Sequence, residues 1–347
     1  MKRIKIKYEK IYSVNHIIRS IRRYNKNRPK NKQISDNLIY DSKLVSALSY
    51  KLKTLDKIDF SKYREKILPV SSTNKKERRL LIPSKTNLLI QACLLELVES
   101  EMDKKIPLNS YSSRKNRGTH VLMLNLRKFI RKVPSYKKLY CLYFDIHKYY
   151  DNIDHDILFD KIKNIFKDKN IIELFGKIIY SVPNSKGIPI GNACSHLLAN
   201  LYQAEILDYV NKSPRAQFAA VYMDNWVILS TNKKKLASLR KTLFKKLKTL
   251  KLEVNPDYTI YQVNNNRGVK IAGFVVFKNT KTYCYPSTWK KIKRIISLIK
   301  NTPYKINSHI ARSFMSRYGT FKYIRQFKKI HNLIKSNLDL IKTLCKK

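Results

Sequence analysis

Acidic residues are scarce in this sequence, which has 24 Asp and Glu among 347 residues against 73 Lys and Arg. The formal net charge is therefore +49 at pH 7. A chain poor in large apolar residues would be disordered at such a charge, but 43% of these residues are hydrophobic. We expect a folded protein whose partner is a polyanion, either a nucleic acid or an anionic membrane surface.

Long apolar runs are lacking as well. The longest, residues 88–98, is interrupted by Gln91 and Glu96 and is shorter than the roughly 18 residues needed to span a bilayer. The N-terminus has no apolar stretch of about 7–15 residues, which a signal peptide would need. We therefore expect a cytoplasmic protein without a membrane partner, and the charge favours a nucleic acid.

Cysteine and glycine are both infrequent. The five cysteines are scattered, with no Cys-x-x-Cys pair and no His at ligand spacing: Cys93, Cys141, Cys194, Cys284 and Cys345. This spacing argues against a structural zinc site and against a disulfide framework. Only 7 residues are Gly, and with abundant Lys, Asn and Ile this composition is also what an AT-rich genome produces.

The hydrophobic pattern predicts mixed helices and strands with no linker dividing the chain. Residues 1–66 are expected to form basic helices around a polar loop at 25–33, and 75–83 a short strand. Further helices are expected at 87–102, 121–131, 157–166, 171–182, 195–210 and 233–252, and from about 287 to the end. Strands are expected at 139–146, in a hairpin at 219–229, and in a second hairpin of 269–277 with 282–285.

Two aspartates stand where strands end. Asp145 closes the β-rich run 139–145, and Asp224 lies at the tip of a hairpin between the apolar stretches 219–221 and 226–229. A carboxylate between segments that favour burial is costly without a metal. One such aspartate is more often a turn former or a helix cap. Two that meet in space are what two-metal phosphoryl transfer requires.

Three segments, taken in chain order, resemble the palm motifs of reverse transcriptases. They are residues 144–158, residues 187–202 with the turn Gly-Ile-Pro-Ile-Gly, and residues 222–225 with the sequence Tyr-Met-Asp-Asn. The resemblance covers roughly residues 75–285.

The resemblance implies an α+β right-hand polymerase with RNA-directed DNA polymerase activity. Residues 1–138 would form a basic N-terminal region with helical and β fingers, 139–285 an RRM-like antiparallel palm with the metal site, and 286–347 a helical thumb. The enzyme would add dNTPs to a primer 3′-hydroxyl. Two Mg²⁺ ions, for which Mn²⁺ could substitute, would be its cofactors.

By the same resemblance, Asp145, Asp224 and Asn225 are the catalytic residues. Asp145 and Asp224 would bind the metal ions, with the backbone carbonyl of Ile146 as a further ligand.

The resemblance also implies a nucleotide site. Tyr150 lies five residues after Asp145, where reverse transcriptases carry an aromatic side chain that collides with a ribose 2′-hydroxyl and so selects dNTPs. Tyr149 competes for this role, and a core tyrosine is the structural alternative. Gly191 and Ser195 would shape the floor beneath the templating base, since glycine lets the backbone approach closely.

Cations of the fingers would hold the phosphates of the incoming nucleotide, and the candidates are Arg78, Arg79 and Lys85. Arg78 and Arg79 are not distinguished, because the distance to the following proline varies among relatives. Arg114, Lys115 and Arg117 are expected on template phosphates instead.

Two positions depart from the family pattern. Asn225 stands where most reverse transcriptases have a second aspartate, although a neutral amide can coordinate weakly or hydrogen-bond a metal-bound water. Asp257 and Tyr258 occupy the stretch in which relatives usually have a lysine after the proline.

Within the superfamily, residues 110–120 and 188–196 resemble the compact bacterial enzymes of diversity-generating retroelements, followed by those of retrons and abortive-infection or other antiphage systems. His196 stands where the diversity-generating enzymes usually have Gln. Together with Asn225, this favours a divergent branch in phage defence.

The expected partners are an RNA template, which could be a dedicated non-coding RNA, a DNA product and dNTPs. About 60 residues follow Tyr285, too few for a nuclease domain, so an accessory protein is a further expected partner. Two alternatives stay open. One is an RNA-binding palm-fold scaffold with reduced or lost catalysis, and the other is template-independent or protein-primed DNA synthesis.

Overall fold

A computed structural model describes residues 3–26, 28, 33–35, 39, 41–69, 77–182, 184–302, 304, 306–325 and 327–346. The chain forms two compact units, each assembled from three segments. The first unit comprises Met1–Ser113, Ile146–Tyr209 and Leu243–Val254. The second comprises Arg114–Asp145, Val210–Thr242 and Asn255–Lys347.

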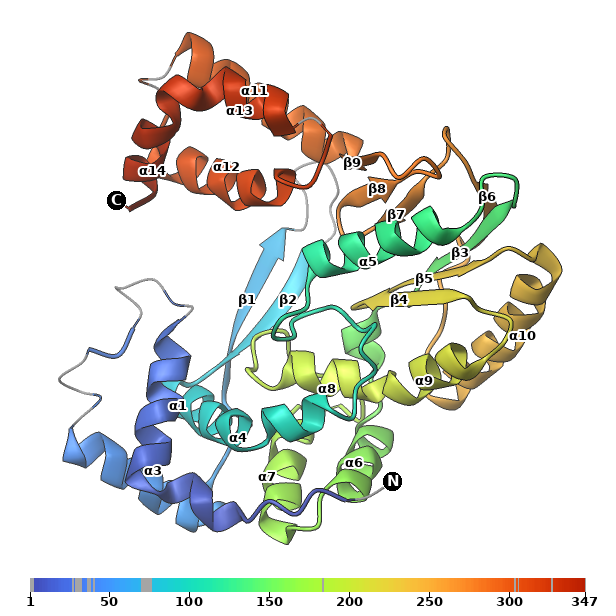
Figure 1. Ribbon diagram of the computed structural model, residues 1–347. Coiled ribbons are helices and arrows are strands. Elements are labelled where there is room, and N and C mark those ends of the chain that lie inside the picture. The colour runs from blue at the N-terminus through green and yellow to red at the C-terminus, as the bar shows by residue number, and fades with distance from the viewer. Residues whose placement is uncertain are drawn as a thin grey trace. The chain divides into compact units, whose positions relative to one another are not determined.

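A four-stranded antiparallel sheet organises the second unit (Figure 1). Its order is β4 (Phe218–Tyr222), β5 (Asn225–Ser230), β3 (Leu139–Asp145) and β6 (Thr259–Val263). Alternate residues of β3 and β5 point to one face, where Phe144 and Trp226 stack at 5.5 Å with neither side chain exposed. The strand β6 was not predicted from the sequence.

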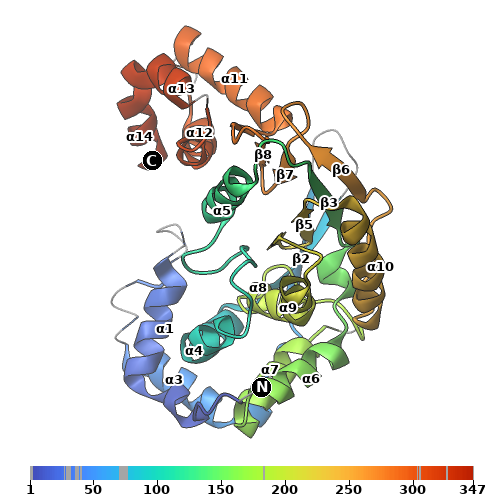
Figure 2. The same cartoon turned by 45° about the vertical axis from the view of Figure 1, so that its right-hand side comes forward.

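The second unit also contains a smaller antiparallel sheet of β7 (Val269–Ile271), β8 (Phe274–Val276) and β9 (Thr282–Cys284). The prediction of a single strand at 269–277 was wrong. Ala272 and Gly273 have φ angles of 49° and 88°, so the chain reverses inside that stretch. The helix α5 (Thr119–Lys132) lies against β4 and β8, as Figure 2 shows for β8.

Helices complete the second unit after β9. They are α11 (Pro286–Asn301), α12 (Ser308–Phe321), α13 (Phe327–Ile334), η6 (Lys335–Asn337) and α14 (Leu338–Lys346). The expectation of a helical C-terminal region is confirmed for the described residues.

The first unit is mostly helical. Its helices are η1 (Tyr8–Tyr12), α1 (Val14–Lys26), α3 (Ser42–Lys53), η3 (Leu55–Lys57), α4 (Lys85–Asp103), η4 (Tyr149–Asn152), α6 (His155–Ile165), α7 (Lys169–Ile179) and α8 (Ser195–Tyr202). It also has a two-stranded sheet of β1 (Tyr63–Pro69) and β2 (Glu77–Pro83). The prediction that residues 1–66 are helical was therefore wrong at its end, where β1 begins.

The predicted helix at 195–210 is two helices, α8 and α9 (Ala204–Lys212), which meet at Gln203. Apart from His196, the residues of α8 are buried, so this helix has no broad polar face. Tyr202 donates a hydrogen bond to the carbonyl of Leu250 at 2.6 Å. The basic helix α10 (Lys233–Thr249) agrees closely with the expected 233–252.

An aspartate side chain caps the N-terminus of α6. Asp154 Oδ1 accepts the backbone N–H of Ile157 at 3.0 Å, as an N-cap aspartate should. Lys251 forms an ion pair with the other carboxylate oxygen at 2.5 Å.

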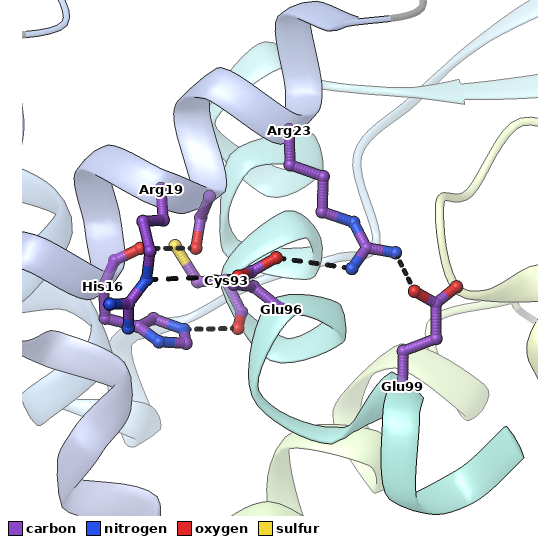
Figure 3. Close-up of polar contacts among 7 residues, drawn as sticks. His16, Arg19, Arg23, Cys93, Glu96 and Glu99 are labelled. Carbon is purple, nitrogen blue, oxygen red and sulfur yellow. Dashed lines mark hydrogen bonds and ion pairs between the residues drawn. The ribbon is translucent and has the colours of Figure 1, made fainter. Parts of the chain in front are cut away.

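A polar seam joins α1 to α4 in the first unit (Figure 3). His16 is buried, and its Nε2 lies 2.8 Å from the carbonyl oxygen of Cys93. Burial lowers the pKa of His16, which keeps the ring neutral near pH 7. Arg23 is held by ion pairs to Glu96 and Glu99 of α4, so this cation of the basic N-terminal helix binds within the protein.

The five cysteines are free thiols, and all but Cys345 are buried. Among the described helices, none is long and apolar enough to cross a bilayer.

Candidate active site

The tip of the β4–β5 hairpin is a two-residue turn of Met223 and Asp224, closed by the pair Tyr222 and Asn225. Met223 has a φ of 58°, in the left-handed region that costs a non-glycine residue roughly 1–2 kcal/mol. Such strain persists where the surrounding structure enforces it. The paired strands on both sides of the turn do so here, and they place Asp224 at the tip.

Strand register brings Asp145 to the same place. Asp145, the last residue of β3, lies directly opposite Asn225, the first residue of β5. Opposed residues of antiparallel strands point to the same face, with Cβ atoms about 4.5–5.5 Å apart. The structure therefore brings together the three residues predicted to be catalytic, Asp145, Asp224 and Asn225, in the second unit.

Each of the two aspartates receives a hydrogen bond from an asparagine amide. Asn225 Nδ2 donates to Asp224 Oδ1 at 2.7 Å. Asn255 Nδ2 donates to Asp145 Oδ2, and the backbone N–H of Asn255 donates to the carbonyl of Asp145 at 3.0 Å. On the other side of Asn225, the hydroxyl of Tyr143 donates to its Oδ1 at 2.7 Å.

Sequence reasoning missed Tyr143 and Asn255 as site residues. Tyr143 carries a usable signal, because a residue two positions before Asp145 on a strand lies on the same face. Asn255 carries none, since it is 110 residues from Asp145 in the chain.

The hydroxyl of Tyr143 is electrostatically linked to both carboxylates. Burial raises its pKa to about 12, and the charges of Asp145 and Asp224 add to the effect, as does Tyr285. The hydroxyl therefore stays protonated near pH 7 and remains a hydrogen-bond donor. The shared effect also indicates that both carboxylates lie within electrostatic reach of the same hydroxyl.

Ile146 forms an isolated antiparallel bridge with Val254. Hydrogen bonds between the neighbouring residues flank this bridge, one of them from the N–H of His147 to the carbonyl of Glu253 at 2.8 Å. In a pair of this kind the N–H and C=O groups of the two bridged residues point away from each other. The carbonyl of Ile146 is therefore not used by Val254.

The donor atoms suit a hard divalent cation. Asp145 and Asp224 supply carboxylate oxygens, which Mg²⁺ prefers to sulfur or imidazole ligands. Within the part of the chain that the structure describes, no group of three or more His, Cys, Asp or Glu side chains could hold a metal. A Mg²⁺ site shared with substrate phosphates needs only one or two carboxylates, so these residues fit that kind of site.

The two candidate tyrosines of the first unit have different environments. Tyr149 is 3% exposed, and its hydroxyl donates to the carbonyl of Ala199 at 2.5 Å. Tyr150 is partly exposed, and its hydroxyl lies 2.8 Å from Nδ1 of His196. Tyr149 is therefore a core residue, whereas Tyr150 presents a ring at the surface of the first unit.

Gly191 and Ser195 belong to a tight turn in the first unit. Gly191 has a φ of 138°, and a Cβ atom there would lie 2.7 Å from the carbonyl oxygen of Leu81 in β2. Only glycine fits this approach. Ser195 is 2% exposed and donates its hydroxyl to the carbonyl of Pro189 at 2.6 Å, so its side chain fixes the turn from inside.

The three cations predicted to bind the nucleotide phosphates have different surroundings where the structure describes them. Lys85 is exposed at the first position of α4. Arg79 forms a two-pronged pair with Glu65 of β1, with distances of 2.5 and 2.8 Å, and this hydrogen bond raises its pKa. The side chain of Arg78 lies outside the described residues.

The side chains expected on the template differ in exposure, and so do the two residues that stand where relatives usually have a lysine. Arg114 is only 8% exposed, so its side chain is largely unavailable to a template, whereas Lys115 is exposed. Asp257 is exposed, and the hydroxyl of Tyr258 accepts a hydrogen bond from Arg240 at 2.9 Å.

Comparison with proteins of known structure concerns the fold. The chain is similar to the apo telomerase of Candida tropicalis, with 13% identity and a TM-score of 0.54 over 87% of this chain and 64% of that one. It is also similar to the telomerase of Candida albicans in complex with a fragment of telomeric RNA, with 13% identity and a TM-score of 0.51 over 81% of this chain and 55% of that one.

The chain is also similar in sequence to known proteins. The chain is 22% identical over 192 residues to the COX1/OXI3 intron 1 protein of Saccharomyces cerevisiae. The aligned stretch covers 50% of this chain and 21% of the yeast protein. The family model described as "Reverse transcriptase (RNA-dependent DNA polymerase)" matches residues 70–276. That stretch is more than half of the chain and contains both aspartates of the site. The chain thus belongs to the reverse transcriptase (RNA-dependent DNA polymerase) family.

Proposed function

We propose that this chain adds dNTPs to a primer 3′-hydroxyl on an RNA template by two-metal phosphoryl transfer. The observation that carries the proposal is the β3–β5 register, which places Asp145 opposite Asn225 and next to the turn holding Asp224. Asp145, Asp224 and the carbonyl of Ile146 would hold two Mg²⁺ ions. Bound Mg²⁺ would activate the hydroxyl and neutralise charge on the triphosphate.

Tyr150 is the proposed sugar-selecting residue. Its ring is partly exposed and its hydroxyl is tied to His196, so the ring has a fixed position from which to exclude a ribose 2′-hydroxyl. Gly191, by its close approach to β2, and Ser195, by its bond inside the turn, would shape the floor beneath the templating base.

Lys85, Arg78 and Arg79 are the proposed contacts to the nucleotide phosphates. Lys85 can bind a phosphate directly because it is exposed. Arg79 would have to exchange its pair with Glu65 for a phosphate, and the planar guanidinium suits both partners equally.

An RNA template is the proposed partner of the basic surface. One basic depression of about 970 Å³ in the first unit is lined by several cations, among them Arg3, Lys5, Lys10, Lys104 and Lys105. Lys104 is paired with Glu101 of the same lining, whereas Arg3, Lys5 and Lys10 form no ion pair with other described residues. Cations of this kind bind nucleic-acid phosphates with release of counterions.

The biological setting is proposed from the resemblance of the motifs. A bacterial or phage retroelement or an antiphage defence system would use a dedicated RNA and an accessory protein with a compact polymerase of this kind. Domains of fingers (1–138), palm (139–285) and thumb (286–347) and a cytoplasmic location belong to the same proposal. The free, buried cysteines suit a reducing compartment.

Primer extension on an RNA template with dNTPs and Mg²⁺ tests the proposal. We expect extension by the wild-type protein, and its loss in Asp145→Asn and Asp224→Asn at unchanged thermal stability. Asp339→Asn is the matched control, since its carboxylate is 93% exposed on α14. Full activity of Asp145→Asn would contradict the mechanism.

The same assay separates the alternatives. An RNA-binding scaffold would bind the template without incorporating nucleotides under any divalent metal. Template-independent synthesis would proceed when the RNA is left out. In protein-primed synthesis the labelled product would stay attached to the protein after denaturation.

A further inference from the structure

We propose that Asn225 and Asn255 are positioning residues, each of which holds one of the two metal-binding aspartates, and that Tyr143 fixes the amide of Asn225. This inference rests on the proposed function. It changes the role of Asn225, whose amide would orient Asp224 and not bind a metal ion itself.

The orientation of the Asn225 amide follows from hydrogen-bond chemistry. An ionised carboxylate can only accept, so the group 2.7 Å from Asp224 Oδ1 must be the NH₂ of Asn225. The amide oxygen then faces Tyr143, whose hydroxyl donates to it at 2.7 Å. Rotating the amide to offer its oxygen to a cation would break both hydrogen bonds.

Asn255 holds Asp145 by two bonds from one residue. Its side-chain amide donates to Oδ2, and its backbone N–H donates to the carbonyl of Asp145 at 3.0 Å. The backbone hydrogen bond fixes the position of the Asn255 main chain, and the side-chain hydrogen bond fixes the orientation of the Asp145 carboxylate. A carboxylate has about four lone-pair sites, so one donated bond leaves the group able to bind a cation.

Neutral donors suit this place better than a third carboxylate while no metal is bound. An aspartate at position 225 would face Asp224 across 2.7 Å with like charge, whereas the amide attracts it. Partners that orient metal ligands typically contribute about 10–100-fold to metal affinity. The two asparagines would therefore act before any nucleotide arrives, by keeping both carboxylates in a binding geometry.

Direct binding of Mn²⁺ to the nucleotide-free protein, followed by electron paramagnetic resonance, tests this. We expect Asn225→Ala, Asn255→Ala and Tyr143→Phe each to weaken Mn²⁺ binding by roughly tenfold or more. Tyr143→Phe combined with Asn225→Ala should bind no more weakly than Asn225→Ala alone, because Tyr143 acts only through that amide. Tyr140→Phe is the matched control, since Tyr140 lies on the same strand but the opposite face.

Thermal unfolding, measured first without metal in a chelator and then with excess Mn²⁺, gives a second readout. Asn225→Asp should lower the melting temperature in the absence of metal, and Mn²⁺ should then raise it by more than in the wild type. Asn255→Leu, which is uncharged and similar in size but cannot donate a hydrogen bond, replaces Asn255→Ala if the latter does not fold.

Each outcome decides between the claims. If Tyr143→Phe or Asn255→Ala bound Mn²⁺ as tightly as the wild type, the positioning role of the altered residue would be overturned. Additive losses in the double variant would show that Tyr143 does not act through Asn225. If the wild type itself bound no Mn²⁺, the metal site of the proposed function would fail, and the positioning roles would fail with it.

Discussion

At the residue scale, Tyr150 is the side chain whose removal should change the choice of sugar. In Tyr150→Ala we expect the ratio of kcat/KM for a dNTP to that for the matching rNTP to fall by roughly tenfold or more, because the ring that excludes the 2′-hydroxyl is gone. Steady-state incorporation of both nucleotides measures this. His196→Ala should give a smaller change in the same direction, since it removes the contact that steadies the ring.

An unchanged ratio in Tyr150→Ala would contradict the assignment. Tyr136→Ala is the control for loss of an aromatic ring, because Tyr136 is 81% exposed and has no proposed role.

Gly191 should be the glycine least tolerant of a side chain. Gly191→Ala would place a Cβ 2.7 Å from a backbone oxygen at a φ of 138°, and we expect it to lower the free energy of unfolding by about 1–3 kcal/mol. Chemical denaturation measures this. Gly319→Ala is the control, since the added Cβ meets nothing within 4 Å in α12, and it should stabilise by up to about 1 kcal/mol.

At the scale of elements, the cap of α6 should make stability depend on acid. Burial raises the pKa of Asp154, but the bonds from Lys251 and from backbone amides outweigh it and lower the pKa below the usual value. A carboxyl with a lowered folded pKa stabilises the fold above its unfolded pKa of about 3.9. That contribution is lost as the pH falls through the folded pKa.

We therefore expect Asp154→Ala to cost about 0.5–2 kcal/mol near pH 7, with the cost shrinking below about pH 4. Denaturation of both proteins between pH 7 and pH 3 measures it. Asp160→Ala is the control, since Asp160 sits on the same helix in an exposed ion pair and should change little. A cost that stayed constant down to pH 3 would contradict the role of the charge.

The elements that the sequence predicted are those with a strong local pattern. The β4–β5 hairpin has apolar strands on both sides of a polar tip. In α10, apolar residues recur at helical spacing over a long stretch. The strand β1, with the sequence Tyr-Arg-Glu-Lys-Ile-Leu-Pro, is charged and lies at a sheet edge, so it lacks the alternation that marks a half-buried strand. The strand β6 is only 5 residues long and is fixed by pairing with β3.

At the scale of the whole molecule, the net charge of +49 should govern RNA binding. We expect the affinity for an RNA–DNA duplex to fall steeply with salt, with a slope in log affinity against log salt that reflects the phosphates contacted. Replacing Arg3, Lys5 and Lys10 together by Ala should reduce the slope by up to about 2–3 if each contacts one phosphate.

Fluorescence anisotropy at several salt concentrations measures that slope. Lys163→Ala with Lys342→Ala is the control pair, since both lysines are already engaged in ion pairs along their helices. An unchanged slope in the triple variant would exclude the basic depression from the RNA contact.

The order of motifs along the chain predicted the polymerase family and the meeting of Asp145 with Asp224, because motif order reflects the topology of one sheet. It could not predict how the carboxylates are held. Asn255 lies 110 positions after Asp145 and reaches it only through tertiary folding. Arg79 contacts Glu65 only because β1 pairs with β2. Contacts of this kind depend on tertiary structure and leave no local pattern.

The buried cysteines make the molecule a reporter of its own unfolding. Burial raises the pKa of Cys93 and of Cys141 to about 12, and a thiol that stays protonated reacts slowly with alkylating reagents. Cys345 near the C-terminus is the partly exposed exception. A single dye can therefore be attached there without mutation, and the slower modification of the other four thiols would then time the opening of the core.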